Sequence, residues 1–509
     1  MNRNTKLMLK TLLVFMVIIV LLTIVEYQAE GSTIRNIWDA IWYSLITLTT
    51  VGYGDKAPVT LPGRILGIML ALCSVGLLST LVGIVLHLLR GQLLPRLKLR
   101  GWSSVKWYVF NCSGSDAETL ADELASAEDC MLIFPTDDEY ANRIDRNRVY
   151  FDGNVQELGK VRGNTDGMTL ILMKEDPWQN YREGLEAAEA FVESYCMADI
   201  TAEDKPDLLH LFGREECLGR WYWKQFPLLP EEKSVVLIGC GRSGSAVLER
   251  ALLTNVYTPD RTVEYHVFED SAGFEKLHTE LVKALSPGTQ GEDSLIFHGE
   301  DWADCISVLR DADRIIICRD CEKDNLQCME QLATWFGIKD KAHVRLDKEM
   351  KGVSSFGESG KILTRENVMK NALNRQAVLM HEIYNRGSDN PVPFEDLSYF
   401  LQQSNIAAAD HMLVKIRYLL GDEKLTQITE ENCRKAYEVY IKTKDEKADL
   451  YQEMEHRRWV RFHQLHNWTF SPVRNNDKRQ HHLLLPYGEL DPSEQKKDAY
   501  AWEMLGMLY

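Results

Sequence analysis

The stretch TTVGYGDKAP, residues 49–58, is a short polar segment between two long apolar runs. One run extends from Thr11 to Val25, and the other, from Ile65 to Leu89, contains no Asp, Glu, Lys or Arg. Each can supply the roughly 20 residues needed to cross a bilayer. Basic residues precede the first run and follow the second, so both ends should face the cytoplasm. We therefore expect two membrane crossings joined by a short external hairpin. A cleaved signal peptide is the alternative for the first run.

The hairpin has the composition of a helix followed by a carbonyl-lined loop. Residues 37–50, IWDAIWYSLITLTT, are amphipathic and long enough for a short helix. Irregular backbone at membrane depth is tolerated only where it is buried in protein or lines a cavity. A loop whose carbonyls line an axis meets this rule by coordinating cations. Successive carbonyls can face one axis only if the backbone alternates in handedness, and Gly52 and Gly54 allow that at little cost.

The sequence TTVGYGD resembles the selectivity filter of potassium channels, and the likeness extends over residues 38–90. The resemblance implies that four copies of the loop replace the hydration shell of K⁺ with carbonyl oxygens. It implies a homotetramer in the lipid bilayer of the cell membrane, with both termini cytoplasmic. It assigns the filter to Thr50, Val51, Gly52, Tyr53 and Gly54, the first four as carbonyl ligands, and the hydrogen bond behind the filter to Trp42 and Asp55.

Two positions depart from the family pattern. Ile46 stands where many members carry a glutamate, so filter stability and inactivation are not carried over. Ser74 stands at the usual hinge glycine of the inner helix. Nearby glycines could bend that helix, although glycine in a membrane helix is at least as often a packing site. The candidate gate and hinge positions are Ser74, Gly76, Ser79 and Gly83.

The remainder of the chain reads as a soluble α/β body. The 509-residue chain has a net charge of −17, and most of the excess acidic residues lie in this body. A negative charge of this size argues against a nucleic-acid partner. Apolar strands alternate with helical stretches in two successive units, which predicts two parallel sheets. Strands are expected at 105–110, 130–135, 147–153, 167–174 and 207–213 in the first unit, and at 233–239, 263–270, 294–301, 313–320 and 342–347 in the second.

Eleven cysteines without framework spacing indicate free thiols in a reducing compartment. Cys318, Cys321 and Cys328 are the nearest approach to a metal motif, but they have no clear fourth ligand. Buried thiols are the favoured interpretation. We expect no metal site and no catalytic residues.

The second unit opens with a strand, a glycine-rich turn and a helix. Its glycines would let backbone amides approach phosphate oxygens at the helix N-terminus, and an acid at the end of the next strand would bind ribose hydroxyls. A structural turn without a ligand is the alternative. The first unit keeps only Gly114 of such a turn, so we expect a structural role there. The candidate nucleotide-binding residues are Gly239, Gly241, Arg242, Ser243, Gly244, Glu269 and Asp270.

A pore followed by two dinucleotide-type units resembles channels with tandem RCK domains, the regulators of potassium conductance. In that family eight such domains form a ring that acts on the inner helices when ligand binds. Residues 453–498 resemble the RyR domain, named for ryanodine receptors, with matches at Trp459, Trp468, Phe470, His482, Leu485, Pro486, Tyr487, Leu490 and Asp498; Asn467 replaces the family's glycine.

Indoles can stack on a base and arginines can pair with phosphate. The RyR ligand candidates are therefore Trp468, Phe470, Arg474, Arg479 and His481. The alternative is that the aromatic residues form the small core of this module, as we expect for Trp459 and Leu485.

The expected organisation is a two-span pore (1–100), two Rossmann-like units (101–230 and 231–350), a helical region (351–445) and a mostly helical RyR-like domain (446–509). The expected function is a potassium channel gated by a nucleotide: NAD, ADP, ATP, ADP-ribose or a cyclic nucleotide. One alternative is a membrane-tethered NAD-dependent enzyme or redox sensor. Another is a potassium channel that acts as a nucleotide-triggered defence effector.

Overall fold

The structure is a computed structural model that describes residues 3–88, 94–135, 146–151, 154–190, 192–200, 205–289, 291–388 and 390–508. Only the backbone is described for residues 3–12, 73–81, 84–88 and 155. The chain folds as two compact units: residues 1–104 with 135–164, and residues 105–134 with 165–509.

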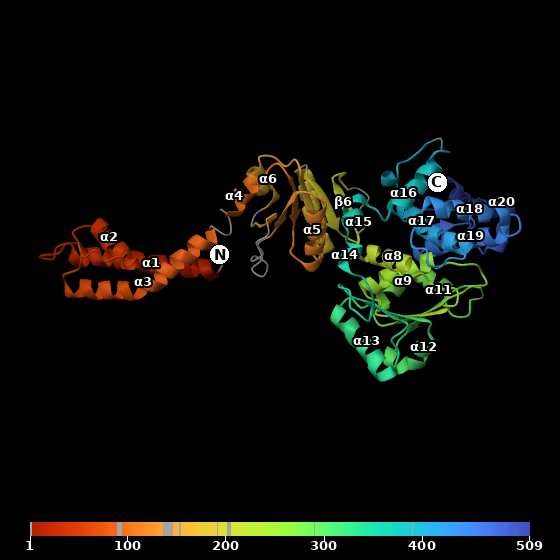
Figure 1. Cartoon of the computed structure of the whole chain (residues 1–509), viewed down its shortest axis with the longest axis horizontal. Coiled ribbons are helices and arrows are strands. Elements are labelled where there is room, and N and C mark those ends of the chain that lie inside the picture. The colour runs from red at the N-terminus through yellow and green to blue at the C-terminus, as the bar shows by residue number, and fades with distance from the viewer. Residues whose placement is uncertain are drawn as a thin grey trace. The chain divides into compact units, whose positions relative to one another are not determined.

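The first unit begins with three helices that pack on one another, α1 (Arg3–Glu26), α2 (Ile37–Leu48) and α3 (Leu61–Leu88) (Figure 1). The first apolar run lies in α1, and the described part of the second, residues 65–88, lies in α3. Ile19, Leu22, Ile34 and Ala40 are buried between the helices. Across the described part of the chain, no helix combines the length and the apolar composition that crossing a membrane requires. The unit also contains α4 (Leu94–Gly101), β3 (Arg148–Tyr150) and α6 (Val155–Arg162).

The second unit contains two parallel sheets, as the sequence predicts. The first sheet includes β1 (Lys106–Phe110), β2 (Cys130–Phe134), β4 (Met168–Leu172), β5 (Glu193–Met197) and β6 (Leu209–Phe212), in the order β2-β1-β4-β5-β6. Its connections carry α5 (Ser115–Ala127), α7 (Pro177–Glu189) and α8 (Arg214–Gln225). Strand β5 was not among the expected strands, because its sequence ESYCM has no apolar run.

The second sheet has the order β12-β11-β10-β7-β8-β9. Its strands are β7 (Ser234–Ile238), β8 (Glu264–Phe268), β9 (Ser294–His298), β10 (Arg314–Ile317), β11 (Ala342–Arg345) and β12 (Ser354–Phe356). Its helices are α9 (Arg242–Thr254), α10 (Ala272–Leu277), α11 (Thr279–Ala284), η2 (Trp302–Cys305), α12 (Ile306–Asp311) and α13 (Glu322–Phe336). The strand order reverses between β7 and β10, and ligands of open α/β sheets bind at such a switch point. The three-residue edge strand β12 was not expected.

Helices α8 and α9 join the two sheets by close packing (Figure 1). A Cβ at Gly219 would lie 2.5 Å from the Ala246 carbonyl oxygen, so only glycine permits this approach. Trp223 Nε1 donates to the Val247 carbonyl oxygen at 2.8 Å across the same contact. The two sheets therefore share one continuous helical interface.

The C-terminal third is mainly helical. It contains α14 (Ser359–Ile362), α15 (Arg365–Lys370), α16 (Arg375–Asn385), η3 (Phe394–Asp396), α17 (Tyr399–Leu420), α18 (Glu430–Thr443) and α19 (Ala448–Leu465). After these come β13 (Thr469–Phe470), β14 (Gln480–His481), η4 (Tyr487–Glu489), α20 (Pro492–Gln495), η5 (Lys496–Ala499), α21 (Tyr500–Glu503) and η6 (Met504–Met507). Lys415 and Glu455 form a buried ion pair of 2.6 Å between α17 and α19.

Candidate functional site

The filter segment, residues 50–54, follows directly from the C-terminal end of α2. The carbonyl oxygen of Ile46, in the last turn of α2, accepts the N–H groups of both Val51 (2.9 Å) and Gly52 (3.2 Å). Thr49 ends the helix, and its Oγ1 donates to the carbonyl oxygen of Leu45 at 2.8 Å. Backbone hydrogen bonds therefore connect the start of the filter segment to the last turn of α2.

The backbone of this segment alternates in handedness. Thr50, Gly52 and Gly54 have φ of 59°, 56° and 75°, whereas Val51 and Tyr53 are not in the left-handed region. A β-branched residue at positive φ is a genuine outlier, and such strain persists where the surroundings over-determine it, often at functional sites. This alternation is the conformation that the sequence suggests for a carbonyl-lined loop.

Aromatic side chains connect α2 to the far end of the filter segment. Trp42 Nε1 donates to Asp55 Oδ2 at 2.9 Å, the hydrogen bond expected from the sequence. The Trp42 ring is stacked with that of Tyr53, with centroids 6.2 Å apart and planes 8° apart. Lys56 and Asp39 add an ion pair of 3.0 Å. These contacts connect α2 to the end of the segment and to the two residues that follow it.

Glu26, at the C-terminal end of α1, is a structural residue that the sequence analysis missed. Its buried carboxylate accepts hydrogen bonds from the Ser32 hydroxyl, from the Val59 and Thr60 backbone N–H groups, and from Thr60 Oγ1. A Cβ at Gly63 would lie 2.1 Å from Glu26 Oε1, so glycine is required beside it. The carboxylate caps the start of α3 and thereby joins it to α1. The sequence does give one indication of this role, because Glu26 is an acidic residue placed directly after the apolar run that ends at Val25.

The four candidate hinge positions lie in α3, which is an uninterrupted helix from Leu61 to Leu88. The side chains at Ser74, Gly76 and Ser79 lie outside the described residues. A Cβ at Gly83 would meet no atom within 4 Å. The close approaches observed in α3 are instead near its start, at Gly63 beside Glu26 and at Gly67, where a Cβ would lie 2.6 Å from the Tyr43 hydroxyl.

In the second sheet, the glycine-rich turn between β7 and α9 is filled by a carboxylate of the same chain. Asp320 accepts the backbone N–H of Arg242 at 3.1 Å and that of Ser243 at 2.9 Å. These are the amides that the sequence analysis assigned to a phosphate. A Cβ at Gly241 would lie 2.6 Å from Asp320 Oδ2. Asp320 thus occupies the position of an anionic ligand at this helix N-terminus.

The other two glycines of the turn serve packing. Gly239 has φ of 91°, and a Cβ there would lie 2.9 Å from the backbone nitrogen of Arg319. A Cβ at Gly244 would lie 1.9 Å from the Gly239 carbonyl oxygen, because α9 passes very close to the end of β7. This explains both glycines without reference to a ligand.

The predicted ribose acid is also paired. Both oxygens of Glu269 accept hydrogen bonds from Arg319, each at 2.7 Å. These bonds raise the pKa of the Arg319 guanidinium above its ordinary value. Glu269 and Asp270 have positive φ of 64° and 54°, so the chain turns sharply after β8. As placed, the turn does not fit a nucleotide, because its two amides and its acid are already bonded.

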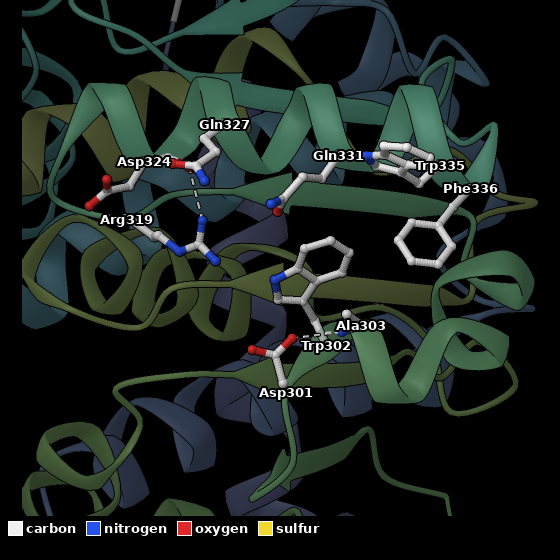
Figure 2. A pocket seen from close by; sticks show the side chains of 9 residues that line it. All are labelled: Asp301, Trp302, Ala303, Arg319, Asp324, Gln327, Gln331, Trp335 and Phe336. Atoms are coloured by element: carbon white, nitrogen blue, oxygen red, sulfur yellow. Dashed lines mark hydrogen bonds between the residues drawn. The ribbon is translucent and has the colours of Figure 1, made fainter.

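A cavity of about 550 Å³ lies next to this pair. Figure 2 shows Arg319 at one end, Trp335 and Phe336 at the other, and the ring of Trp302 between them. Arg319 Nη1 donates to the carbonyl oxygen of Asp324, at the start of α13. Trp302 is buried, whereas 78% of Trp335 is exposed. The cavity therefore offers a cation at one end and an open aromatic surface at the other.

Residues 7–91 match the family model described as "Ion channel". The chain is 44% identical over 62 residues to a voltage-gated potassium channel of Aeropyrum pernix, and this match covers 12% of this chain and 21% of that protein. It is 33% identical over 100 residues to the calcium-gated potassium channel TvoK of Thermoplasma volcanium, covering 18% and 29%. The chain thus spans less than a third of the length of these relatives.

The solved structure described as GsuK bound to ADP shares 14% identity with this chain, with a TM-score of 0.36. It covers 73% of this chain and all of that one. A second structure, the GsuK channel bound to NAD, has 13% identity, a TM-score of 0.34 and coverage of 73% and 85%. At such TM-scores the likeness does not extend to the ligands that these descriptions name.

In the first sheet, the turn after β1 keeps only Gly114 of the glycine-rich pattern and leads into α5, whose first turn makes structural contacts. Asp116, in the first turn of α5, accepts from Arg214 Nε at 2.9 Å and from the Ser359 hydroxyl at 2.5 Å. Arg214 also bonds to Asp347, which follows β11 of the second sheet, at 3.2 Å. The start of α5 therefore contributes, through Asp116 and Arg214, to the contact between the two sheets.

The five RyR ligand candidates divide into two groups. Trp468 and His481 are buried, with rings 6.3 Å apart. Burial lowers the pKa of His481 to about 4. Phe470, Arg474 and Arg479 are exposed; Arg479 Nη1 donates to the His466 carbonyl oxygen, and Arg474 Nε to Asn476.

Trp468 packs as a core residue in this module. Its ring is stacked on Phe400 of α17, with centroids 5.3 Å apart. Trp459 and Leu485, expected in the core, are only half-buried. The aromatic side chains thus serve packing between α17 and the last module as well as within it.

Proposed function

We propose that this chain forms a potassium-selective channel as a homotetramer. The observation that carries the proposal is the alternating handedness of residues 50–54, in a segment that matches an ion-channel family and resembles potassium channels. One chain supplies one quarter of a ring of carbonyl oxygens, so four copies are needed to replace the hydration shell of K⁺. The bond from Trp42 to Asp55 would hold the segment in this conformation.

In this proposal α1 and α3 lie in the cell membrane, and α2 enters it only partly. The basic residues Lys6 and Lys10 before the first apolar run and Arg96 and Lys98 after the second favour cytoplasmic termini. The C-terminal end of α2 carries the negative end of the helix dipole, which favours a cation near the inner end of the filter.

The two-sheet body would act as the regulator, in the manner of tandem RCK domains, with residues 446–509 as an RyR-like module. We infer that the ligand is a nucleotide whose phosphate displaces Asp320 from the α9 amides. A phosphate carries the same sign of charge as the carboxylate and offers more acceptor oxygens. The ligand can shift the pore equilibrium only by its differential affinity for the two states.

Arg319 gives this displacement a second effect. Arg319 bonds to Glu269 and also lines the cavity. Because Asp320 directly follows Arg319 in the chain, a ligand that displaced Asp320 would also shift the backbone of Arg319. Movement at the turn would therefore reach the cavity wall through one backbone segment.

The test is K⁺ flux into liposomes that contain the full chain, with NAD, ADP, ATP, ADP-ribose and a cyclic nucleotide added singly. We expect K⁺ flux above Na⁺ flux and a change in K⁺ flux with one of these compounds. If none of the nucleotides changed the K⁺ flux, the proposal that a nucleotide gates the channel would be contradicted. Flux without a preference for K⁺ over Na⁺ would contradict the proposed potassium-selective pore. The variant Gly54→Asp, which changes the filter, is the control for leak through the lipid.

A further inference from the structure

A mixed group of metal-ligating side chains lies at the carboxyl end of β9, away from the glycine-rich turn. The ligand atoms of His298, Glu300 and Cys305 all lie within 4.8 Å of one another. His298 ends β9, and Cys305 ends the 3₁₀ helix η2. The chain therefore brings one nitrogen, one oxygen and one sulfur ligand together within eight residues.

These ligand types select a particular class of metal. Imidazole and thiolate ligands favour Zn²⁺ and similar first-row transition-metal ions, whereas Ca²⁺ and Mg²⁺ prefer oxygen ligands. Three protein ligands leave the fourth tetrahedral position of Zn²⁺ open. His298 and Cys305 are half-buried and Glu300 is exposed, so an ion can reach the group from solvent.

The orientation of His298 is set by two aromatic neighbours from β8. Its Nε2 lies 3.0 Å from Nδ1 of His266, and its ring is stacked on Phe268, with centroids 4.2 Å apart and planes 9° apart. A ligating histidine uses one nitrogen for the metal and bonds the other to a neighbour that fixes the ring. His266 is placed to be that neighbour.

The local electrostatics suit a cation. Three acidic residues, Glu300, Asp301 and Asp304, lie in the same eight-residue segment as His298 and Cys305. A divalent cation would be attracted by the carboxylates and would release the thiol proton as it binds.

We propose that His298, Glu300 and Cys305 bind one Zn²⁺-class metal ion, with His266 as a positioning residue. Asp301 and Trp302, between Glu300 and Cys305 in the chain, line the cavity of Figure 2. A metal bonded to Glu300 and Cys305 holds both ends of that segment. Metal binding therefore restrains one wall of the cavity, whether or not the proposed pore function is correct.

The first experiment is a titration of the chelator-treated full chain with Co²⁺, which reports thiolate ligation by a charge-transfer band in the near ultraviolet. We expect one Co²⁺ per chain and displacement by Zn²⁺. Cys305→Ser should abolish the band, and Cys321→Ser, which alters an exposed cysteine outside the group, should leave it. Absence of the band in the natural chain, or its retention in Cys305→Ser, would overturn the proposal.

The positioning role of His266 has its own readout. His266→Phe keeps an aromatic ring but cannot hold His298, so Co²⁺ affinity should fall about 10- to 100-fold while the charge-transfer band remains. An unchanged affinity would remove His266 from the site.

A second measurement needs no variant. Zn²⁺ should slow alkylation of Cys305 by iodoacetamide and leave that of Cys321 unchanged, as followed by mass spectrometry of the two peptides. Equal rates for Cys305 with and without Zn²⁺ would overturn the proposal independently of any folding defect.

Discussion

The exchange of Asp320 for alanine tests whether this carboxylate competes with a ligand for the α9 amides. Its two hydrogen bonds, of 3.1 and 2.9 Å, resemble those of a helix N-cap at an exposed position. Such a cap is worth about 0.5–2 kcal/mol. If the bonded state is favoured by about 1 kcal/mol, the turn is open about 15% of the time, and by about 2 kcal/mol, about 3%.

The apparent affinity for a ligand is reduced by the fraction of protein that can bind it. Asp320→Ala should therefore tighten binding of ADP or NAD about 6- to 30-fold. Asp320→Asn keeps a capping side chain without the charge, so it should give a smaller gain. Isothermal titration calorimetry on the full chain in detergent measures both.

Asp313→Ala is the matched control. Asp313 Oδ2 accepts the backbone N–H groups of Lys233 (2.7 Å) and Ser234 (3.0 Å) at the amino end of β7, opposite the glycine-rich turn. The control removes the same charge and the same number of backbone bonds, so affinity should not change. Equal affinities for the natural chain and Asp320→Ala, or equal gains in both alanine variants, would refute the competition.

Three further predictions concern stability, measured by chemical denaturation. Glu455→Gln should lower the free energy of unfolding by about 3–5 kcal/mol because it leaves the buried Lys415 without its ion-pair partner. As the control, Lys435→Met breaks the exposed Lys435–Glu431 pair, which has the same length of 2.6 Å, and should cost less than about 1 kcal/mol. Gly244→Ala should cost about 3 kcal/mol or more through its clash with the backbone, whereas Gly273→Ala, with open space, should be neutral or stabilising. Burial lowers the pKa of His463 to about 3, so the unfolded chain binds more protons and stability should fall as pH drops below about 6.5; His463→Gln should reduce that slope. Equal costs within either matched pair, or an unchanged slope, would contradict the corresponding argument.

The sequence was sufficient where a local pattern has one physical solution. Alternating glycines in TTVGYGD predicted the alternating backbone, and the strands of strong apolar character, such as β7 and β10, were expected at their places. Strand β5 was missed because its buried positions include Ser194, which gives no apolar signal.

Contacts between distant parts of the chain could not be predicted. Asp320 reaches the α9 amides across 77 and 78 residues, and Arg319 reaches Glu269 across 50. Nothing in either local sequence marks these pairs, so a turn with the composition of a phosphate site is occupied by the chain itself. By contrast, His298, Glu300 and Cys305 lie in one octapeptide and could have been found from their spacing.

Residue type also did not separate ligand contacts from core packing. Trp468 and Phe470 are two positions apart in the chain, and either could stack on a base. The structure buries Trp468 against Phe400 and exposes 49% of Phe470. That difference depends on the packing of α17, which the local sequence does not encode.

The most direct test of the proposed pore is the reversal potential of the full chain in a planar bilayer with K⁺ on one side and Na⁺ on the other. We expect a reversal potential set by K⁺ for the natural chain and the loss of that preference in Gly54→Asp. Currents that reverse near zero in the natural chain, or that keep their K⁺ preference in Gly54→Asp, would contradict a filter built from residues 50–54.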